Sequence, residues 1–181
     1  PYADPVHKIS IISRGRAAGY TLKLPIEDRK LQSKKEFLDD IAVSLGGYIV
    51  ERDIFGDLTT GSSNDLQVST ALARDMVTKY GMSEKIGPVA LESGEVMFGK
   101  GIATDKEYSE KIGAEIDNEV SKIMNGALDK AQDIITEHRK ALDNISARLI
   151  EVETIEREEF ETLLIANGIV PKKKKDIEHS K

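Results

Sequence analysis

The sequence predicts a mainly α-helical protein with a small β-hairpin or sheet near its N-terminus and a long C-terminal helical hairpin. Apolar residues recur at intervals of three and four across residues 33–80 and again across 105–150. That spacing is typical of amphipathic helices. The first 25 residues instead combine short apolar groups with glycine, which is typical of short strands joined by a turn.

The predicted hairpin occupies Pro1 to about Pro25. Two groups of apolar residues flank the glycine-containing stretch Ser13–Gly19, and a turn in this stretch would bring the two groups side by side. The apolar positions are Val6, Ile9, Ile11 and Ile12 in the first group and Tyr20, Leu22 and Leu24 in the second. Two short strands are therefore expected.

The first predicted helix begins after Ser33. Ser33-Lys34-Lys35-Glu36 has the spacing of a capping box, in which the serine and the glutamate each satisfy a main-chain N–H group. Phe37, Ile41 and Leu45 follow at intervals of four. Because glycine disfavours helix, we expect this helix to end at Gly46-Gly47.

A second helix is predicted to start near Ser62 or Ser63, after a loop over Gly56–Gly61. Gly81 has the position of a glycine that ends a helix. The residues expected to face inward are Leu66, Leu72, Ala73, Met76, Val77 and Tyr80. Residues Met82–Thr104 hold no sustained period, and we expect a structured loop there.

The long apolar stripe begins after Asp105 and predicts a helical hairpin or a kinked long helix. Its members are Ile112, Ile116, Val120, Ile123, Ala127, Ala131, Ile134, Leu142, Ile145 and Leu149. Asn125-Gly126 is expected to weaken the first helix, and His138–Lys140 is the expected junction. The stripe does not keep strict heptads, so packing within a helical bundle is favoured over a coiled coil.

A last helix is predicted over about Arg157–Ala166, closed by Gly168. Phe160, Leu163 and Leu164 are expected to face inward. Residues 169–181 form a polar, Lys-rich tail that includes Lys172–Lys175. Runs of one charge sign repel and stay solvated, so a disordered tail is expected; weak attraction to anionic lipid or to a partner is the alternative.

Composition restricts the chemistry that the chain can perform. There are 26 basic and 32 acidic residues, a net charge of −6, and the two signs are interspersed, so no nucleic-acid partner is expected. No cysteine is present, which excludes disulfides and thiolate metal sites. Any metal must be bound by histidine or carboxylate.

The histidines are too few and too far apart to form a metal site by themselves. They are His7, His138 and His179, no pair is spaced i, i+4, and no H-E-x-x-H motif occurs. No G-x-S-x-G elbow and no phosphate-binding G-x-x-x-x-G-K-[ST] loop occurs either. Serine hydrolysis and nucleotide binding by these residues are therefore not supported.

Thr59–Leu66 is a short polar loop that leads into the second helix, and it carries Asp65. One interpretation is structural: a serine caps the helix and Asp65 interacts favourably with the helix dipole, together worth about 0.5–2 kcal/mol. The other is that Asp65 projects from the first turn as one of three protein ligands of a metal. The residue pattern alone does not choose between them.

An ordered set of segments resembles the FtsH family of membrane-bound AAA zinc proteases. These segments are Asp4-Pro5-Val6-His7-Lys8; Ile11-Ile12-Ser13-Arg14-Gly15-Arg16-Ala17; Leu45-Gly46-Gly47 with Glu51 and Phe55-Gly56; Thr59 to Leu66; Ala73 to Ser83; Gly87-Pro88; Glu153-Thr154-Ile155; and Glu158-Glu159-Phe160. Each is weak alone, but order and spacing match up to about Gly168.

The resemblance implies that residues 1–168 are a helical peptidase domain without its first helix. In that family an H-E-x-x-H helix stands just upstream, so no catalytic residue is expected in this chain; the general-base glutamate would precede it. Asp65 matches the third zinc ligand. Glu51 matches an acidic residue near the zinc, where it would orient a ligand from the outer shell.

The resemblance also implies properties of a longer parent protein. Zinc would be its catalytic metal, and a separate ATPase module would bind ATP and Mg. The parent would be a homo-hexamer anchored in the membrane by segments outside this sequence, and it would degrade unfolded or membrane proteins. We expect the peptidase domain to face the cytoplasm, most simply at a bacterial inner membrane, and the present chain to be inactive alone.

An extended substrate is expected to add to one of the two predicted strands by main-chain hydrogen bonds. The candidate residues are Ile9, Ile11 and Ile12 on the first strand and Gly19 and Tyr20 on the second. Some positions depart from the family pattern: Tyr48 replaces Arg, Arg52 replaces Glu and Ser62 replaces Ala. The competing interpretation is a catalytically dead, protease-like module for oligomerisation or adaptor binding.

Overall fold

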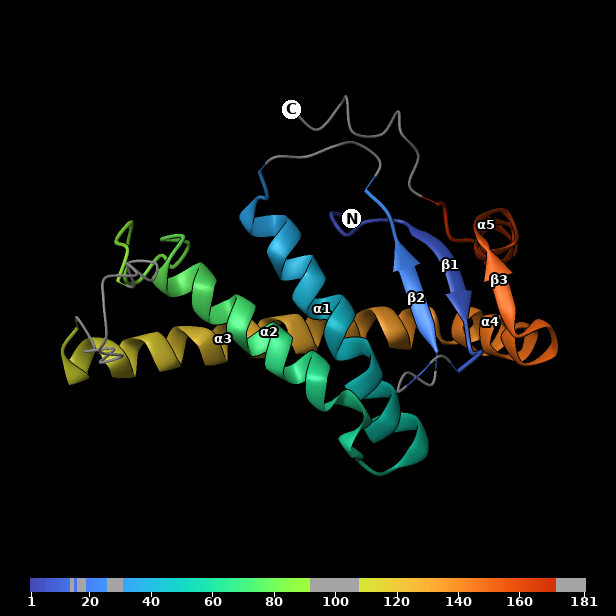
Figure 1. Cartoon of the computed structure of the whole chain (residues 1–181), viewed down its shortest axis with the longest axis horizontal. Coiled ribbons are helices and arrows are strands. Elements are labelled where there is room, and N and C mark those ends of the chain that lie inside the picture. The colour runs from blue at the N-terminus through green and yellow to red at the C-terminus, as the bar shows by residue number, and fades with distance from the viewer. Residues whose placement is uncertain (14, 16–18, 26–30, 92–107, 172–181) are drawn as a thin grey trace. The chain divides into compact units, whose positions relative to one another are not determined.

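A computed structural model describes residues 1–13, 15, 19–25, 31–91 and 108–171. Its elements are β1 (Val6–Ser10), β2 (Tyr20–Lys23), α1 (Lys34–Val50), η1 (Glu51–Phe55), η2 (Thr60–Ser62), α2 (Ser63–Thr78), α3 (Glu110–Glu137), α4 (Arg139–Val152), β3 (Thr154–Glu156) and α5 (Arg157–Ala166) (Figure 1). Helix dominates, so the predicted mainly α-helical class with a small sheet is confirmed. None of these helices is long and apolar enough to cross a bilayer.

The chain divides into two compact units, which are described separately. The sheet unit comprises residues 1–32 and 133–181, and the helical unit comprises residues 33–132. Residues 172–181 of the predicted tail, including Lys172–Lys175, lie outside the described residues, as does the part of the predicted loop from 92 to 104.

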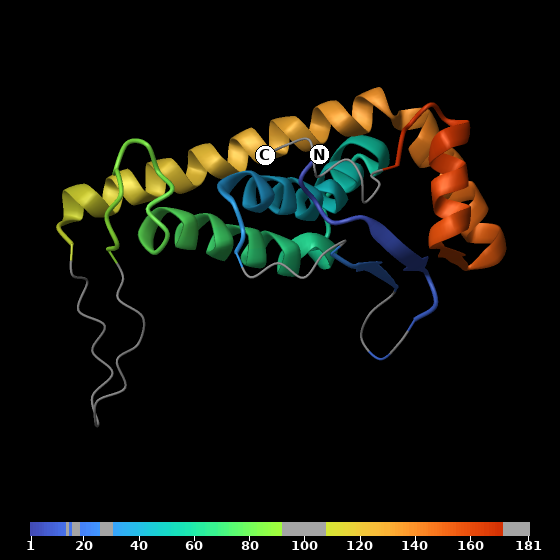
Figure 2. The ribbon, with the colours of Figure 1, turned by 90° about the horizontal axis from the view of Figure 1, so that it is seen from above.

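Helices α1 and α2 form the centre of the helical unit, where α2 runs back alongside α1 (Figures 1 and 2). The capping box predicted at Ser33 is present, because its hydroxyl accepts from the N–H of Glu36 while the Glu36 carboxylate accepts from the N–H of Ser33. The buried apolar side chains are Phe37, Ile41, Ala42, Leu45 and Ile49 of α1, Ala73, Met76 and Val77 of α2, and Ile116, Val120, Ala127 and Ala131 of α3. These faces make the core expected from the three- and four-residue spacing.

The prediction that the first helix ends at Gly46-Gly47 is wrong, because α1 continues to Val50. Ile49 lies one turn beyond Leu45 and is fully buried. Its burial contributes about 1.5–3 kcal/mol, which offsets the roughly 1 kcal/mol cost of each helical glycine. The helix then widens into the π-turn η1 and ends at Gly56, whose φ of 73° is left-handed.

The second predicted helix is confirmed as α2, with two differences. Tyr80 was expected to face inward but is 51% exposed; its ring stacks on Phe37 at a centroid distance of 5.5 Å and covers the end of the core from outside. Leu66 and Leu72 are only half-buried, whereas Ser69 and Thr78 are buried. The predicted loop over Gly56–Gly61 holds the start of the short 3-10 turn η2.

Helices α3 and α4 meet at His138, as predicted. Asn125 and Gly126 lie within α3, which continues through them without a break. The last helix has the predicted bounds, and Gly168 follows it with a φ of 78°. Phe160, Leu163 and Leu164 are half-buried.

The sheet unit contains a third strand that the sequence pattern did not predict. Strand β3 has only three residues, too few to show a period, and it follows α4 through Glu153, whose φ of 58° ends that helix. The sheet is antiparallel with the order β2-β1-β3, so β1 is its central strand. Ile155 of β3 is fully buried.

Candidate metal-ligand site

Asp65 lies in the first turn of α2 and is exposed. Its carboxylate makes no hydrogen bond or ion pair with the described residues. Ser62, the residue that precedes the helix, makes no capping hydrogen bond through its side chain, so the serine part of the structural interpretation is not present. Asp65 is thus a carboxylate with no partner among the described residues, held on the first turn of a 16-residue helix.

The loop that precedes Asp65 is fixed by Glu51. The Oε2 atom of Glu51 accepts a hydrogen bond from the N–H of Thr59 at 2.9 Å, and its Oε1 atom accepts from the Thr59 hydroxyl at 3.1 Å. The same hydroxyl oxygen accepts from the N–H of Gly61 at 3.0 Å. Glu51 therefore holds Thr59, and the Thr59 hydroxyl in turn holds Gly61 at the end of the segment that leads into α2.

Gly61 lies close to these side chains, and a side chain at this position would require the Glu51 carboxylate to shift. A Cβ atom at this position would lie 2.8 Å from Oε1 of Glu51 and 3.1 Å from Oγ1 of Thr59. The sequence had marked Thr59 and Gly61 only as part of a polar loop. Their contact with Glu51, eight and ten residues earlier, depends on the turn at η1, which the sequence pattern did not reveal.

Arg52, the residue after Glu51, makes a separate set of contacts. Its guanidinium bonds both oxygens of Asp53, with Nε 2.5 Å from Oδ1 and Nη2 3.2 Å from Oδ2. These hydrogen bonds raise the pKa of Arg52 and lower the pKa of Asp53. Arg52 also donates to Oε1 of Gln132 on α3, and its Cζ lies 5.9 Å from the centre of the Tyr48 ring.

The described residues do not complete a metal site. They contain no group of three His, Cys, Asp or Glu side chains that could hold an ion. The donor chemistry of Asp65 nevertheless fits a single zinc ligand, because zinc accepts carboxylate oxygens and this carboxylate is exposed and unpartnered. Remaining ligands would have to be supplied by residues other than those described.

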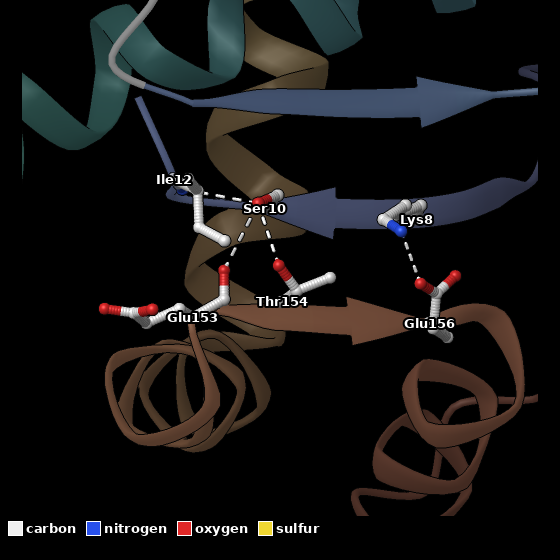
Figure 3. Close-up of polar contacts among 6 residues, drawn as sticks. All are labelled: Lys8, Ser10, Ile12, Glu153, Thr154 and Glu156. Carbon is white, nitrogen blue, oxygen red and sulfur yellow. Dashed lines mark hydrogen bonds and ion pairs between the residues drawn. The ribbon is translucent and has the colours of Figure 1, made fainter. Parts of the chain in front are cut away.

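The five candidate substrate-strand residues belong to the sheet unit, and the structure distinguishes among them. Strand β1 pairs with β2 on one side and with β3 on the other. Beyond its end, the N–H of Ile11 donates to the carbonyl of Glu153 at 3.0 Å. The N–H of Ile12 donates to the hydroxyl of Ser10 at 3.3 Å (Figure 3). Ile9 thus lies on the central strand, and the N–H groups of Ile11 and Ile12 are already bonded.

Tyr20 begins β2, which pairs with β1 alone in the described part of the chain. Gly19 precedes it at a close approach, since a Cβ atom there would lie 2.5 Å from the carbonyl oxygen of Ser10. On the opposite side, the hydroxyl of Ser10 lies 2.9 Å from that of Thr154, and Lys8 pairs with Glu156 at 2.5 Å (Figure 3). These contacts fasten β1 to β3 and leave β2 as the outer strand.

Comparison with known proteins identifies the family. The model of peptidase family M41 matches residues 1–163. The ATP-dependent zinc metalloprotease FtsH of Thermotoga maritima is 47% identical over 167 residues, which cover 91% of this chain and 27% of that protein. The protein of the same name from Bacillus subtilis is 42% identical over 174 residues, covering 94% and 27%, respectively.

A third relative, ATP-dependent zinc metalloprotease FtsH 1 of Conexibacter woesei, is 46% identical over 165 residues, covering 90% of this chain and 25% of that protein. The chain belongs to peptidase family M41, and the resemblance to the FtsH family is confirmed. It spans about a quarter of the length of the curated relatives that it matches.

Proposed function

We propose that residues 1–168 are the greater part of the peptidase domain of an ATP-dependent zinc endopeptidase, with Asp65 as one zinc ligand. The observation that carries this proposal is the exposed carboxylate of Asp65, which has no partner in the described part of the chain, at the start of a helix whose approach is fixed by Glu51. A ligand held in this way needs little reorganisation when the metal binds. Membership of peptidase family M41 and the names of the relatives, which are zinc metalloproteases, support the choice of zinc.

The remaining parts of the site are proposed to precede this chain. An H-E-x-x-H helix would supply two histidine ligands and the general-base glutamate, so the 181 residues alone should not cleave protein. The bound zinc would polarise the scissile carbonyl and lower the pKa of a bound water. Asp65 would hold the metal in place, and Glu51 would keep the Thr59–Gly61 segment from shifting.

Substrate binding is proposed at the outer edge of β2. An extended peptide can add to an edge strand by main-chain hydrogen bonds. The N–H of Leu24 donates to the carbonyl of Pro5 at 3.3 Å, so by strand alternation the main-chain groups of Thr21 point to the outer side. Thr21 is therefore the candidate on this strand, because the predicted residue Tyr20 pairs with Ser10 and its main-chain groups alternate toward β1; selection would depend little on substrate side chains.

The intact protein is proposed to share the organisation implied by its relatives. A separate ATPase module would bind ATP and Mg and unfold substrates, and six copies would assemble into a ring. Membrane segments would anchor it with the peptidase domain toward the cytoplasm, where unfolded and membrane proteins would be degraded. The Lys-rich residues 169–181 would form a tail outside the peptidase domain.

The test of the ligand assignment is Asp65→Ala in the intact protein, with Asn64→Ala as its matched control. Loss of one of three ligands should abolish zinc retention and peptide cleavage. If Asp65 only supports the helix start, the variant should lose about 1 kcal/mol of stability and keep its activity. Asn64→Ala perturbs the same turn and should retain both zinc and cleavage.

Zinc content and peptide cleavage are measured in both variants, and ATP hydrolysis checks that the assembly remains intact. Full zinc occupancy with near-normal cleavage in Asp65→Ala would overturn the assignment. Zinc-dependent cleavage by the 181-residue chain alone would contradict the proposal that the other ligands lie outside it.

A further inference from the structure

The π-turn η1 is held by polar contacts and not by the core. None of its residues, Glu51–Phe55, is buried, and Phe55 is 76% exposed. Wider turns of this kind recur at functional sites, and they leave the helix ladder irregular. The position of Glu51 therefore depends on whatever fastens this turn to the rest of the helical unit.

Arg52 supplies that connection. Its Nη2 atom donates to Oε1 of Gln132, 80 residues later on α3. Its two bonds to Asp53 fix the plane of the guanidinium, and the Tyr48 ring lies beneath it one turn earlier on α1. The guanidinium is planar, and with hydrogen bonds on two edges and an aromatic ring against one face it has little conformational freedom left.

The two family departures at Tyr48 and Arg52 are therefore in contact with each other. The resemblance to the FtsH family implies Arg at position 48 and Glu at position 52, and this chain carries an aromatic ring and a cation instead. A cation over an aromatic face is attractive. A glutamate at position 52 could not make the same contacts with Asp53, because two carboxylates would repel.

We propose that Arg52 is a positioning residue that ties η1 to α3 through Gln132 and thereby sets where Glu51 holds the loop before Asp65. The path runs from Gln132 to Arg52, through the main chain to Glu51, and then through Thr59 and Gly61 to the start of α2. This inference rests on the proposed role of Asp65 as a zinc ligand. Its first part, the control of the loop by Arg52, can be tested without zinc.

The test uses Arg52→Ala, Gln132→Leu and the double variant in the intact protein. Without the tie, η1 gains freedom, so hydrogen exchange in peptides covering residues 56–65 should become faster in each variant. The double variant should be no worse than the more affected single variant, because both changes remove one contact. Arg52→Lys keeps the positive charge but loses the planar guanidinium that bonds two partners at once. This variant should keep only part of the wild-type protection from exchange.

Zinc retention and kinetics provide the second readout. We expect roughly 3- to 10-fold weaker zinc retention and a similar fall in kcat with KM unchanged, a smaller loss than the 10–100-fold typical of a direct outer-shell partner. Gln132→Glu gives Arg52 a charged acceptor and should retain normal exchange and zinc. Arg139→Ala is the matched control, because it removes an arginine whose ion-pair partner, Asp143, is one turn away on the same helix.

The outcomes separate the two proposals. Faster exchange at 56–65 with weaker zinc retention supports the inference. Faster exchange in a protein that binds no zinc in any variant supports control of the loop by Arg52 and contradicts the proposed metal function. Unchanged exchange at 56–65, or a loss of protection spread evenly over the whole chain, overturns the inference.

Discussion

Glu51 accepts two hydrogen bonds from Thr59, with one carboxylate oxygen 2.9 Å from the main-chain nitrogen and the other 3.1 Å from the hydroxyl. An ionised acceptor makes stronger hydrogen bonds than a neutral one. These hydrogen bonds join residues only eight apart in sequence, but they connect the end of α1 with the segment that leads into α2. Glu51 therefore fixes the segment that leads into the helix carrying Asp65, while the packing of α2 on α1 places the helix itself.

Replacement of Glu51 should weaken zinc binding more than it weakens the fold. Glu51→Ala removes both acceptors, and we expect zinc affinity in the intact protein to fall about 10–100-fold. Glu51→Gln keeps one acceptor oxygen and should fall between wild type and Glu51→Ala. Zinc affinity is measured by competition with a chelator, alongside the melting temperature.

Asp57→Asn is the control for Glu51. Asp57 lies in the same loop, and its Oδ1 accepts from the N–H of Leu58 at 2.7 Å, a bond that the asparagine oxygen can also make. Its zinc affinity should stay within about twofold of wild type. A Glu51→Ala variant with normal zinc affinity would show that the hydrogen bonds between Glu51 and Thr59 do not position Asp65.

Gly61→Ala should reproduce the effect of losing Glu51. The added methyl group would lie 2.8 Å from Oε1 of Glu51, and the flexible carboxylate can move away at little cost. We expect weaker zinc retention with a stability change within about 1 kcal/mol. The measurements are zinc content and urea unfolding of the intact protein.

Gly46→Ala is the matched glycine substitution within the same unit. A Cβ atom at Gly46 has no neighbour within 4 Å, so alanine should stabilise α1 by about 0.5–1 kcal/mol. Its zinc content should not change. If Gly61→Ala binds zinc as well as Gly46→Ala does, the close approach at Gly61 has no bearing on the site.

Gly19→Ala should destabilise the sheet unit. The new Cβ atom would lie 2.5 Å from the carbonyl oxygen of Ser10 and 3.1 Å from Cα of Ile11. Both are main-chain atoms, so strand β2 would have to move, at a cost of about 1–3 kcal/mol. Hydrogen exchange of residues 6–10 and 20–23 should become faster.

The comparison for Gly19 is Gly126→Ala in α3. Nothing lies within 4 Å of a Cβ atom there, and the helical alanine should gain about 0.5–1 kcal/mol. Opposite signs for the two substitutions are expected in urea unfolding. Equal stability of Gly19→Ala and wild type would contradict the close approach.

The hydrogen-bonded ion pair between Arg52 and Asp53 should be lost only in acid. Its hydrogen bonds lower the pKa of Asp53 in the folded protein, so the stability that it contributes is present above the unfolded pKa and is lost as the pH falls through the folded one. Exchange protection of residues 56–65 in zinc-free protein, corrected for intrinsic rates, should be constant between about pH 5 and 9 and fall below about pH 4.

Asp53→Asn removes the titrating group and supplies the comparison. Its protection should be lower than that of wild type at neutral pH, and the two proteins should converge in acid. A wild-type loop that loses protection near neutral pH would indicate that a different group controls it.

Local patterns were enough to predict most of the helices. The capping box at Ser33, the apolar spacing from Phe37 to Leu45 and the break at His138 are each specified by residues within a few turns of one another. The same locality explains the error at Gly46-Gly47. Glycine propensity is a local quantity, whereas the burial of Ile49 depends on the partner helix.

Sequence determined the candidate ligand, the approximate strands and the family, because these depend on residue identity and order along one chain. Tertiary structure alone decided that β1 is the central strand. The three-residue β3 is too short to show a strand pattern in the sequence, and it pairs with β1 across more than 140 residues. It also decided that Glu51, Thr59 and Gly61 are linked by hydrogen bonds and that Arg52 donates a hydrogen bond to Gln132. Such contacts depend on how helices pack and turn in space, and no spacing along the chain specifies them.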